Sequence, residues 1–590
     1  IITAGIKLAD KNDAINSSLN IAALDNLSMN NHTTGVEVGG SNTGALFTRS
    51  YDYVNTGVDI SGGVTLENKN VLVEENIYKT EDKRKTLVNG EVINDGTLPA
   101  EEYSYKTNKP IYGAVKVAAS NKNVVQAKTN VVQVGLLNAN GAVSTARVGD
   151  GNEQGITSVN VTGANNFKGS KVELGASNQA TAKAEVFTVD VALAGVSCAT
   201  ATAENNSQAK TLVSGQNFVA DEVELSAYTS AIGTFDRNAG IFNIKTHSAE
   251  ATVEGGTGSL NMQLGINTAK AISNNKSELT VENNSFKKST WAVTKAEDVL
   301  TDDKKQIQEI DVTTAHEEFV EGKTELSLEN FNVGTEKVDS KVVDVTIGVG
   351  LGSNQAITEN KSKTTLKFKP GTYKGENLSI EAYNADYSKN TADGNGGSYV
   401  EISPLAAKAK HTNESETTVN ISGEINTSGD VSVVGANYVQ SEMYADAIRA
   451  KIVGGSGVTV DNIINNTATV NLQDAKIKAD GSVSVGTYNT AVFNKENDKA
   501  VLGNGYGAGD TTCGYVNNDI TTTANTNLLG STSIISNGEQ NYYADTDTDI
   551  KSAIYVLSGA AIPDSSAINK LQLTSNNTVN LAKSAQLATG

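Results

Sequence analysis

Residues 418–438 read TVNISGEINTSGDVSVVGANY, and they contain the unit that decides the fold. An apolar–polar alternation beginning at Val419 is followed by a polar turn of about ten residues, and a second alternation begins at Val431 and ends near Tyr438. Alternation with a period of two is typical of a β-strand that buries one face. The unit therefore predicts two short strands joined by a turn.

The same unit recurs elsewhere in the chain. The other copies are SVNVTGANNFKGSKVELGASNQA at 158–180, TLVSGQNFVADEVELSAYTSA at 211–231, TLKFKPGTYKGENLSIEAYNA at 365–385 and TVNLQDAKIKADGSVSVGTYNTA at 469–491. The spacing between the two strands is 11 residues from Leu212 to Val223, 12 from Leu366 to Leu378 and from Val419 to Val431, and 13 from Val159 to Val172 and from Val470 to Val483. A polar lead-in containing Asn precedes several copies, as at 204–207, 274–277, 359–362 and 465–467. Constant spacing in units of different sequence indicates a shared geometric constraint.

Stacked coils satisfy such a constraint, because each coil needs only to place its inward apolar residues over those of the coil below. We therefore expect an all-β fold, a right-handed parallel β-helix (β-solenoid) with hairpin and loop insertions, running as a single rod over residues 1–590. Only 38% of the residues are hydrophobic and only five are Pro, which fits a thin core of continuous strands. At about 20 residues per coil and about 4.8 Å between strands, the rod would be on the order of 140 Å long.

Three segments interrupt the pattern. Residues 74–112 contain a charged cluster, Asn-Gly and Asp-Gly turns and two prolines, and they predict a β-hairpin-type insertion that stands off the rod. Residues 294–323 predict a second insertion that is acidic and more helical, and residues 440–451 are another short helical candidate. Residues 494–517 are rich in Gly and Asn and predict a third insertion.

Charge and apolar content exclude several classes of partner. The net charge of −20 would repel nucleic acid, and no apolar run approaches the roughly 18–20 residues of a membrane span. Cys198 and Cys513 lie 315 residues apart, so we expect no disulfide between them. The chain begins at Ile1 without an initiator Met or a signal peptide, and we interpret it as a mature or excised part of a longer product.

Two stretches carry a family resemblance. Phe218–Ala227 (FVADEVELSA) and Ile477–Val485 (IKADGSVSV) resemble the coils of filamentous haemagglutinin-type exoproteins. The Asn-Asn-Ser/Thr lead-in and the Tyr-Asn-x-Ala sequence after the second strand look like those of leukotoxin-type filamentous adhesins. The resemblance implies a right-handed β-helix, secretion through a dedicated outer-membrane partner, and attachment to host or neighbouring cells. The family's amino-terminal secretion region is missing from these residues, and no catalytic residue carries over.

Enzymatic and metal sites find little support in the sequence. Polysaccharide-active β-helices need clustered Asp residues with Arg or Lys beside them, whereas acidic residues here are dispersed. The four histidines lack metal-ligand spacing, and we interpret each as a lone surface or turn residue. The best metal candidate is the alternating set Asp545, Asp547 and Asp549, but Ile550 and Val556 occupy the Gly and Glu positions of an EF-hand loop. A solvated acidic strand is the interpretation we favour, and we expect no cofactor.

Four tyrosines recur at or near the end of the second strand: Tyr228, Tyr383, Tyr438 and Tyr488. An exposed row of tyrosines would stack on sugars or anchor a protein partner, which makes them partner-binding candidates. The alternative, which we favour, is that they cap the core at the same corner of each unit.

These observations predict a structural and adhesive rod rather than an enzyme. We expect a surface or secreted bacterial exoprotein, located outside the cell, whose insertions attach to a host or neighbouring cell surface, a glycan or a matrix protein. One alternative is a self-assembling surface-layer or filament subunit, because an open solenoid end invites end-to-end pairing. A β-helix enzyme that acts on polysaccharides is the other alternative.

Overall fold

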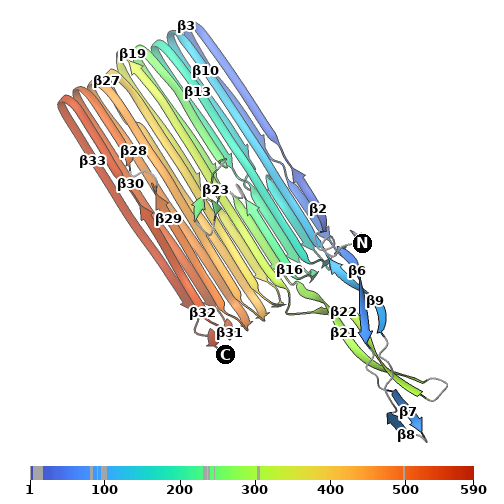
Figure 1. Cartoon of the computed structure of the whole chain (residues 1–590). Coiled ribbons are helices and arrows are strands. Elements are labelled where there is room, and N and C mark those ends of the chain that lie inside the picture. The colour runs from blue at the N-terminus through green and yellow to red at the C-terminus, as the bar shows by residue number, and fades with distance from the viewer. Residues whose placement is uncertain are drawn as a thin grey trace.

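The computed structural model of the chain describes residues 2–3, 17–79, 84–88, 91–94, 102–229, 235–236, 240–244, 246–301, 306–495 and 499–589. Within these residues every regular element is a β-strand, and the strands lie side by side in successive coils (Figure 1). The expected all-β parallel solenoid is thereby confirmed. Residues 81–83, the turns at 89–90 and 95–96, and Pro99, which the first insertion was expected to contain, lie outside the described residues.

The main sheet holds 22 strands, and its pairings are parallel. Its strands are β2 (Ser18–Asp25), β3 (Ser28–Asp52), β4 (Thr56–Ser61), β10 (Ala114–Val148), β11 (Ile156–Thr162), β13 (Lys171–Asn205), β14 (Gln208–Ser214), β16 (Glu222–Thr229), β19 (Ala249–Ser273), β20 (Lys276–Glu282), β23 (Glu325–Thr346), β24 (Val349–Asn360), β25 (Lys363–Lys369), β26 (Thr372–Gly375), β27 (Leu378–Thr427), β28 (Val431–Ala479), β29 (Val483–Phe493), β30 (Lys499–Leu529), β31 (Ser533–Ser536), β32 (Gln540–Ile550), β33 (Ala553–Leu581) and β34 (Gln586–Thr589).

A second sheet of eight strands begins inside the stack and leaves it. Its strands, in spatial order, are β1 (Ile2–Thr3), β5 (Thr65–Glu67), β12 (Asn166–Lys168), β15 (Asn217–Val219), β21 (Ser285–Thr301), β22 (Gln306–Val320), β7 (Arg84–Val88) and β8 (Glu91–Asn94). Two small antiparallel pairs complete the described strands: β6 (Lys69–Lys79) with β9 (Glu102–Tyr112), and β17 (Phe235–Asp236) with β18 (Ile241–Phe242).

The strand register gives the true length of a coil. Val115 pairs with Val172, Val172 with Val223, and Val431 with Val483, which are steps of 57, 51 and 52 residues. Residues that pair from coil to coil form a column along the stack. Nine described coils follow one another, and we number them 1 to 9 by the residue that each contributes to the column of Val115: Leu19, Val115, Val172, Val223, Leu326, Leu378, Val431, Val483 and Gln540. The expected coil of about 20 residues is therefore wrong, and the stack is about 40 Å long rather than 140 Å.

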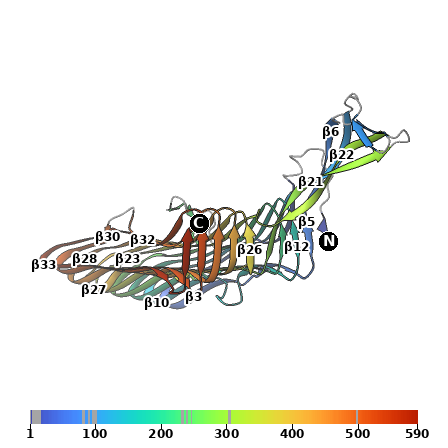
Figure 2. The ribbon, with the colours of Figure 1, turned by 90° about the horizontal axis from the view of Figure 1, so that it is seen from below.

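Each coil is a flat loop with two long legs, as the view from below shows (Figure 2). In coil 2 the outgoing leg begins at Ala114, the far turn lies at Gly135–Leu136, and the return leg runs to Thr162. A short strand at 166–168 then connects the two legs, and we call this closed end of the coil the base. The unit recognised in the sequence is only the base of the coil. The legs went unrecognised because their inward positions are small or polar rather than uniformly apolar.

Two large apolar cores fill the coil, and a small third cluster holds Val439, Ile464, Ala491 and Ile520. Val, Leu and Phe side chains form the core at the base, where Phe167, Phe218 and Phe286 stack with ring centroids 5.3 and 5.2 Å apart. The core between the legs is mostly Ala and Val, as at Ala184 and Ala251. Small side chains let the two legs lie close together over their whole length.

A buried ladder of amides separates the two cores. One column holds Asn121, Asn178, Thr229, Asn332, Asn384, Asn437 and Asn489, all buried. Asn178 donates to the carbonyl oxygens of Gly155 (2.9 Å) and Gln208 (3.0 Å), and Asn437 donates to Asn489 in the next coil (3.1 Å). These amides therefore bond both to the opposite leg and along the stack, which supplies partners for buried polar groups between the cores.

Four details of the sequence reading are corrected. In the copy at 211–231 it is Thr211, not Leu212, that shares the inward column with Val159, so that copy has a spacing of 12. The helical interpretations of 294–323 and 440–451 are wrong, because the first segment contains the hairpin β21–β22 and the second lies inside β28 with alternate residues buried. Residues 499–517 belong to β30 and pair in register with β28 and β33, so the described part of 494–517 is a regular leg rather than an insertion.

Candidate functional site

Both long insertions leave the stack at the same corner of the base. In coils 2 and 3 the chain passes this corner in two residues, 169–170 and 220–221, between the short side and the next outgoing leg. In coil 1 the corner is extended by β6 and β9, and in coil 4 β21 continues past Lys287 into a hairpin with β22. The two insertions then meet, because β22 pairs with β7 at Gln306↔Thr86. We call β6–β9, β22 and the part of β21 after Lys287 the arm (Figures 1 and 2).

Glu317 ties the two halves of the arm together at its root. Its carboxylate accepts hydrogen bonds from the Tyr112 hydroxyl (2.6 Å) and the Ser289 hydroxyl (2.8 Å), and Lys69 Nζ lies 3.3 Å away. Burial acts to raise the pKa of Glu317, but the two hydroxyl donors and the charge of Lys69 outweigh it, so the pKa lies below its ordinary value. Lys69 and Tyr112 come from the first insertion and Ser289 and Glu317 from the second, so this contact joins segments more than 200 residues apart.

Side chains converge in a second place, inside the far end of the legs. Two facing inward columns carry amides and charges there, and Lys451 occupies the next inward position after Arg449. We call these residues the polar tract, and its members are Asn42, Gln133, Asn138, Asp190, Gln263, Asp344, Glu401, Arg449, Lys451 and Asp510. All ten are buried. Nothing in the sequence reading predicted this tract, since its charges lie far apart in the chain.

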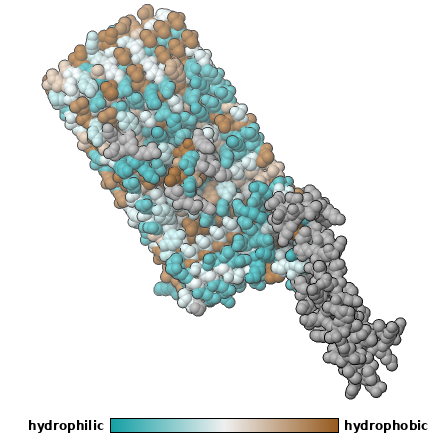
Figure 3. Space-filling model, in the orientation of Figure 1, coloured by the Kyte–Doolittle hydropathy of each residue, from teal (hydrophilic) through white to brown (hydrophobic). Residues whose placement is uncertain are grey.

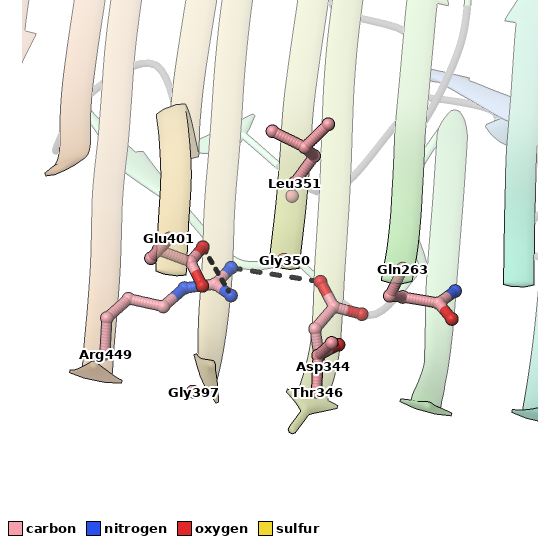
Figure 4. A pocket seen from close by; sticks show the side chains of 9 residues that line it. Gln263, Asp344, Thr346, Gly350, Leu351, Gly397, Glu401 and Arg449 are labelled. Carbon is pink, nitrogen blue, oxygen red and sulfur yellow. Dashed lines mark ion pairs between the residues drawn. The ribbon is translucent and has the colours of Figure 1, made fainter. Parts of the chain in front are cut away.

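Arg449 is the centre of the tract. Its guanidinium lies 3.5 Å from a Glu401 oxygen and 3.9 Å from an Asp344 oxygen, and its side chain is 1% exposed (Figure 4). Burial raises the pKa of Asp344, and the charge of Arg449 offsets part of that rise. Gly396 in the preceding coil makes the arrangement possible, because a Cβ there would lie 2.8 Å from Arg449 Nη1. Two carboxylates and one guanidinium thus share one dry site.

Lys451 and Asp510 form a second buried ion pair one coil further on. Lys451 Nζ lies 2.6 Å from Asp510 Oδ1, and both side chains are fully buried. Burial acts to raise the pKa of Asp510, but hydrogen bonds from Lys451, Ser558 and Thr512 outweigh it and lower the pKa. The pair is therefore charged and structural.

The space around Arg449 limits its chemistry. The cavity bounded by Gln263, Asp344, Glu401 and Arg449 has a volume of about 10 Å³, which is room for about one water molecule. Acid and base groups do converge here, but a sugar ring does not fit beside them. The tract can hold charge in the interior and can bind a single water.

A third buried cluster lies between the two cores and contains His411. The His411 ring bonds to Thr358 Oγ1 through Nδ1 (2.8 Å), and its Nε2 lies 3.9 Å from Asp386 Oδ2. Burial lowers the pKa of His411 to about 3 and raises that of Asp386 to about 6, while burial and the neighbouring Asp386 raise that of Glu336. The surface interpretation of this histidine is wrong, because its column places it on the inward face of the return leg.

The three acidic candidates do not converge. Asp545, Asp547 and Asp549 lie on the exposed face of β32, opposite Tyr488, Thr490 and Val492 of the coil below. Asp545 and Asp549 are four residues apart, about 13 Å along an extended strand, so the three carboxylates do not surround one cation that needs oxygen ligands at 2.3–2.6 Å. The described residues contain no group of three or more His, Cys, Asp or Glu side chains that could hold a metal ion.

The four tyrosines belong to one outward-facing aromatic ladder. Tyr228 stacks on Phe331 (5.2 Å between centroids), Phe331 on Tyr383 (5.2 Å), and the ladder continues to Tyr438 and Tyr488. The four tyrosine rings are half-buried. The segment carrying β17 and β18 packs over part of this face, where Phe235 lies 4.9 Å from Tyr438 and Phe242 lies 5.6 Å from the neighbouring Tyr387. The ladder lies on the outer face of the outgoing legs, so the tyrosines do not cap the core from within.

No family model, no curated protein and no solved structure matches this chain. The described residues also contain no helix with the length and apolarity needed to cross a membrane. The arm is consequently the candidate functional site on structural grounds alone: it is the one large departure from the stack among the described residues, whereas the charged clusters are enclosed. Sequence reading located both insertions, but it had no signal for their pairing, which depends on the coil length.

Proposed function

We propose that this chain is the structural and adhesive rod of a bacterial surface or secreted exoprotein, and that the arm is its attachment element. The observation that carries the proposal is that two insertions, from coils 1 and 4, leave one corner and pair into a single projection. Coils 2 and 3 pass the same corner in two residues, so the stack itself does not need the arm. A stiff scaffold that supports a variable projection is a common arrangement for recognition.

The enclosed charged clusters support a role without catalysis. Arg449, Glu401 and Asp344 are nine-tenths or more buried, and so are Glu336, Asp386 and His411. Their burial, and the small size of the cavity beside Arg449, favour a structural use of these charges. A target of the arm would be a host or neighbouring cell surface, a glycan or a matrix protein.

Removing the arm tests the proposal. The armless variant lacks residues 69–112 and 288–322. Its two corners are then Asn68-Gly113 and Lys323-Thr324, each two residues long like those of coils 2 and 3. The first corner is already closed, because Gly113 N donates to Asn68 O at 3.0 Å. We expect the far-UV circular dichroism and the thermal midpoint of the stack to change little, while attachment to cultured cells, measured with the fluorescently labelled chain, falls at least tenfold.

The matched control replaces Asp545, Asp547 and Asp549 with Asn, which alters an exposed acidic strand at the other end of the stack. This variant is expected to attach like the wild type. Undiminished attachment of the armless chain would contradict the proposal, and loss of its far-UV signal would show that the arm is part of the core.

A further inference from the structure

The far turns of the coils carry a row of exposed apolar side chains. We call it the apolar ridge, and its members are Leu136, Leu137, Leu193, Leu260, Met262, Ile347, Val349, Tyr399, Val400, Ile452 and Val453. They come from the far turns of the six successive coils 2 to 7, and they are 37–61% exposed. Brown, apolar residues recur along this upper edge in Figure 3, the edge at which the strands of Figure 1 turn back. A row of this kind is unusual on the surface of a chain with few hydrophobic residues.

The ridge has no exposed charge near it. Within five residues of its members the charged side chains are Asp190, Asp344, Glu401, Arg449 and Lys451, and all five are buried in the polar tract. The chain as a whole carries a net charge of −20, whereas the charged side chains within five residues of the ridge are enclosed. Coils 1 and 8 bound the ridge with the small sequences Gly39-Gly40-Ser41 and Gly507-Ala508-Gly509.

Part of the ridge backbone is already hydrogen-bonded between neighbouring coils. Where the far turn interrupts the strand pairing, Ile347 N donates to Ser259 O (3.0 Å) and Tyr399 N donates to Gly348 O (3.1 Å). Entry into an apolar medium would therefore leave few backbone groups without partners, which is the main condition for contact with hydrocarbon. The apolar character extends two residues further down both legs, through Val345 on the outgoing leg and Ile402 on the return leg.

We propose that the apolar ridge inserts into the interface of a zwitterionic lipid surface such as a phosphatidylcholine membrane. Two or three residues of extended chain reach about 7–10 Å, which matches the depth at which interfacial elements bury their apolar face. The ridge offers no cation to anionic head groups, and the net charge of the chain is repelled by them. A lipid surface without net charge is therefore the partner that the ridge fits.

The dimensions of the ridge disfavour a second copy of the chain as the partner. Six coils span about 25 Å along the stack, and the two legs pack about 10 Å apart. Projected on a plane, the ridge covers about 250–300 Å². Stable protein interfaces bury about 800 Å² of accessible surface on each partner, so a flat partner surface would need contacts beyond this narrow convex row. A fluid lipid surface, by contrast, adapts to a narrow convex ridge.

The experiment compares the wild-type chain with a ridge variant in flotation with phosphatidylcholine vesicles. The ridge variant carries Val349→Thr, Val400→Thr, Ile452→Thr and Val453→Thr, which keep the β-branched shape and the strand propensity. A matched control carries Val124→Thr, Ile535→Thr, Ile568→Thr and Val579→Thr, at residues that are exposed to a similar degree but lie off the ridge. We expect the wild type and the control to float with the vesicles and the vesicle partition coefficient of the ridge variant to be at least tenfold lower.

A second measurement reports whether the ridge itself enters the lipid. In a Trp291→Phe background, Tyr399→Trp is expected to be quenched by brominated phosphatidylcholine, and this quenching is expected to be lost in the ridge variant. Equal flotation of the wild type and the ridge variant would overturn the proposal, as would binding restricted to anionic vesicles. A wild-type chain that forms dimers by sedimentation velocity but does not bind vesicles would also overturn it and would assign the ridge to self-association.

Discussion

Replacing Arg449 with Leu is expected to lower the free energy of unfolding by about 3–5 kcal/mol, because it leaves two buried carboxylates without their counter-charge. Glu401 and Asp344 would remain in the dry interior, with the Ser398 hydroxyl, 2.7 Å from Glu401, among their few remaining donors. Urea unfolding followed by far-UV circular dichroism measures the loss. Hydrogen exchange of β27 and β28 would show whether it is local to the neighbouring coils, as a solenoid with nearest-neighbour coupling requires.

The control for this prediction is an ion pair at the surface. Arg147 contacts Glu204 at 2.6 Å, but its side chain is 38% exposed, so Arg147→Leu is expected to cost no more than about 1 kcal/mol. The double variant Arg449→Leu/Glu401→Gln is expected to recover part of the stability lost in the single variant, since one orphaned charge is removed. Equal losses for Arg449→Leu and Arg147→Leu would show that the polar tract is hydrated and that its charges are not confined.

Replacing Phe218 with Ala is expected to cost about 3–5 kcal/mol of unfolding free energy. Its ring is 1% exposed and is sandwiched between Phe167 and Phe286 of the neighbouring coils, at 5.3 and 5.2 Å between centroids. Truncation would leave a cavity bounded above and below by rigid rings, which relax little. Thermal and urea midpoints measure the effect.

Phe187 is the matched control, because it lies in the same region of the stack but is 41% exposed on the outer face. Phe187→Ala is expected to change stability by less than about 1 kcal/mol. If the two alanine variants were equally stable, the phenylalanine stack would contribute little, and the base would not be the principal core of the coil.

The base of the coil was predictable from the sequence, whereas the legs were not. At the base, Val and Leu alternate with polar residues at a constant spacing, as from Val419 to Val431, and this pattern identifies two strands and the solenoid class. In the legs the inward positions hold Ala251, Asn384 or Arg449, which single-sequence patterning treats as unremarkable or as exposed. The coil length was consequently underestimated by more than half.

The same reason explains what was missed at the candidate site. The insertions were visible because charged and turn-forming residues break the alternation. The two insertions form one arm because the corners of coils 1 and 4 lie above the same point of the stack. That placement follows only from the register of the coils. Arg449, Glu401 and Asp344 lie up to 105 residues apart in the sequence, so their proximity likewise requires the coil length.

The fold requires coils of about 50–57 residues that lie directly on one another, and a distance between two spin labels tests this most directly. Lys116 and Asn541 are exposed and occupy one outward column, seven register steps apart. With Cys198 and Cys513 changed to Ser and nitroxides placed at 116 and 541, double electron–electron resonance should give about 34 Å. A distance near 100 Å, which coils of about 20 residues would produce, would contradict the structure described here.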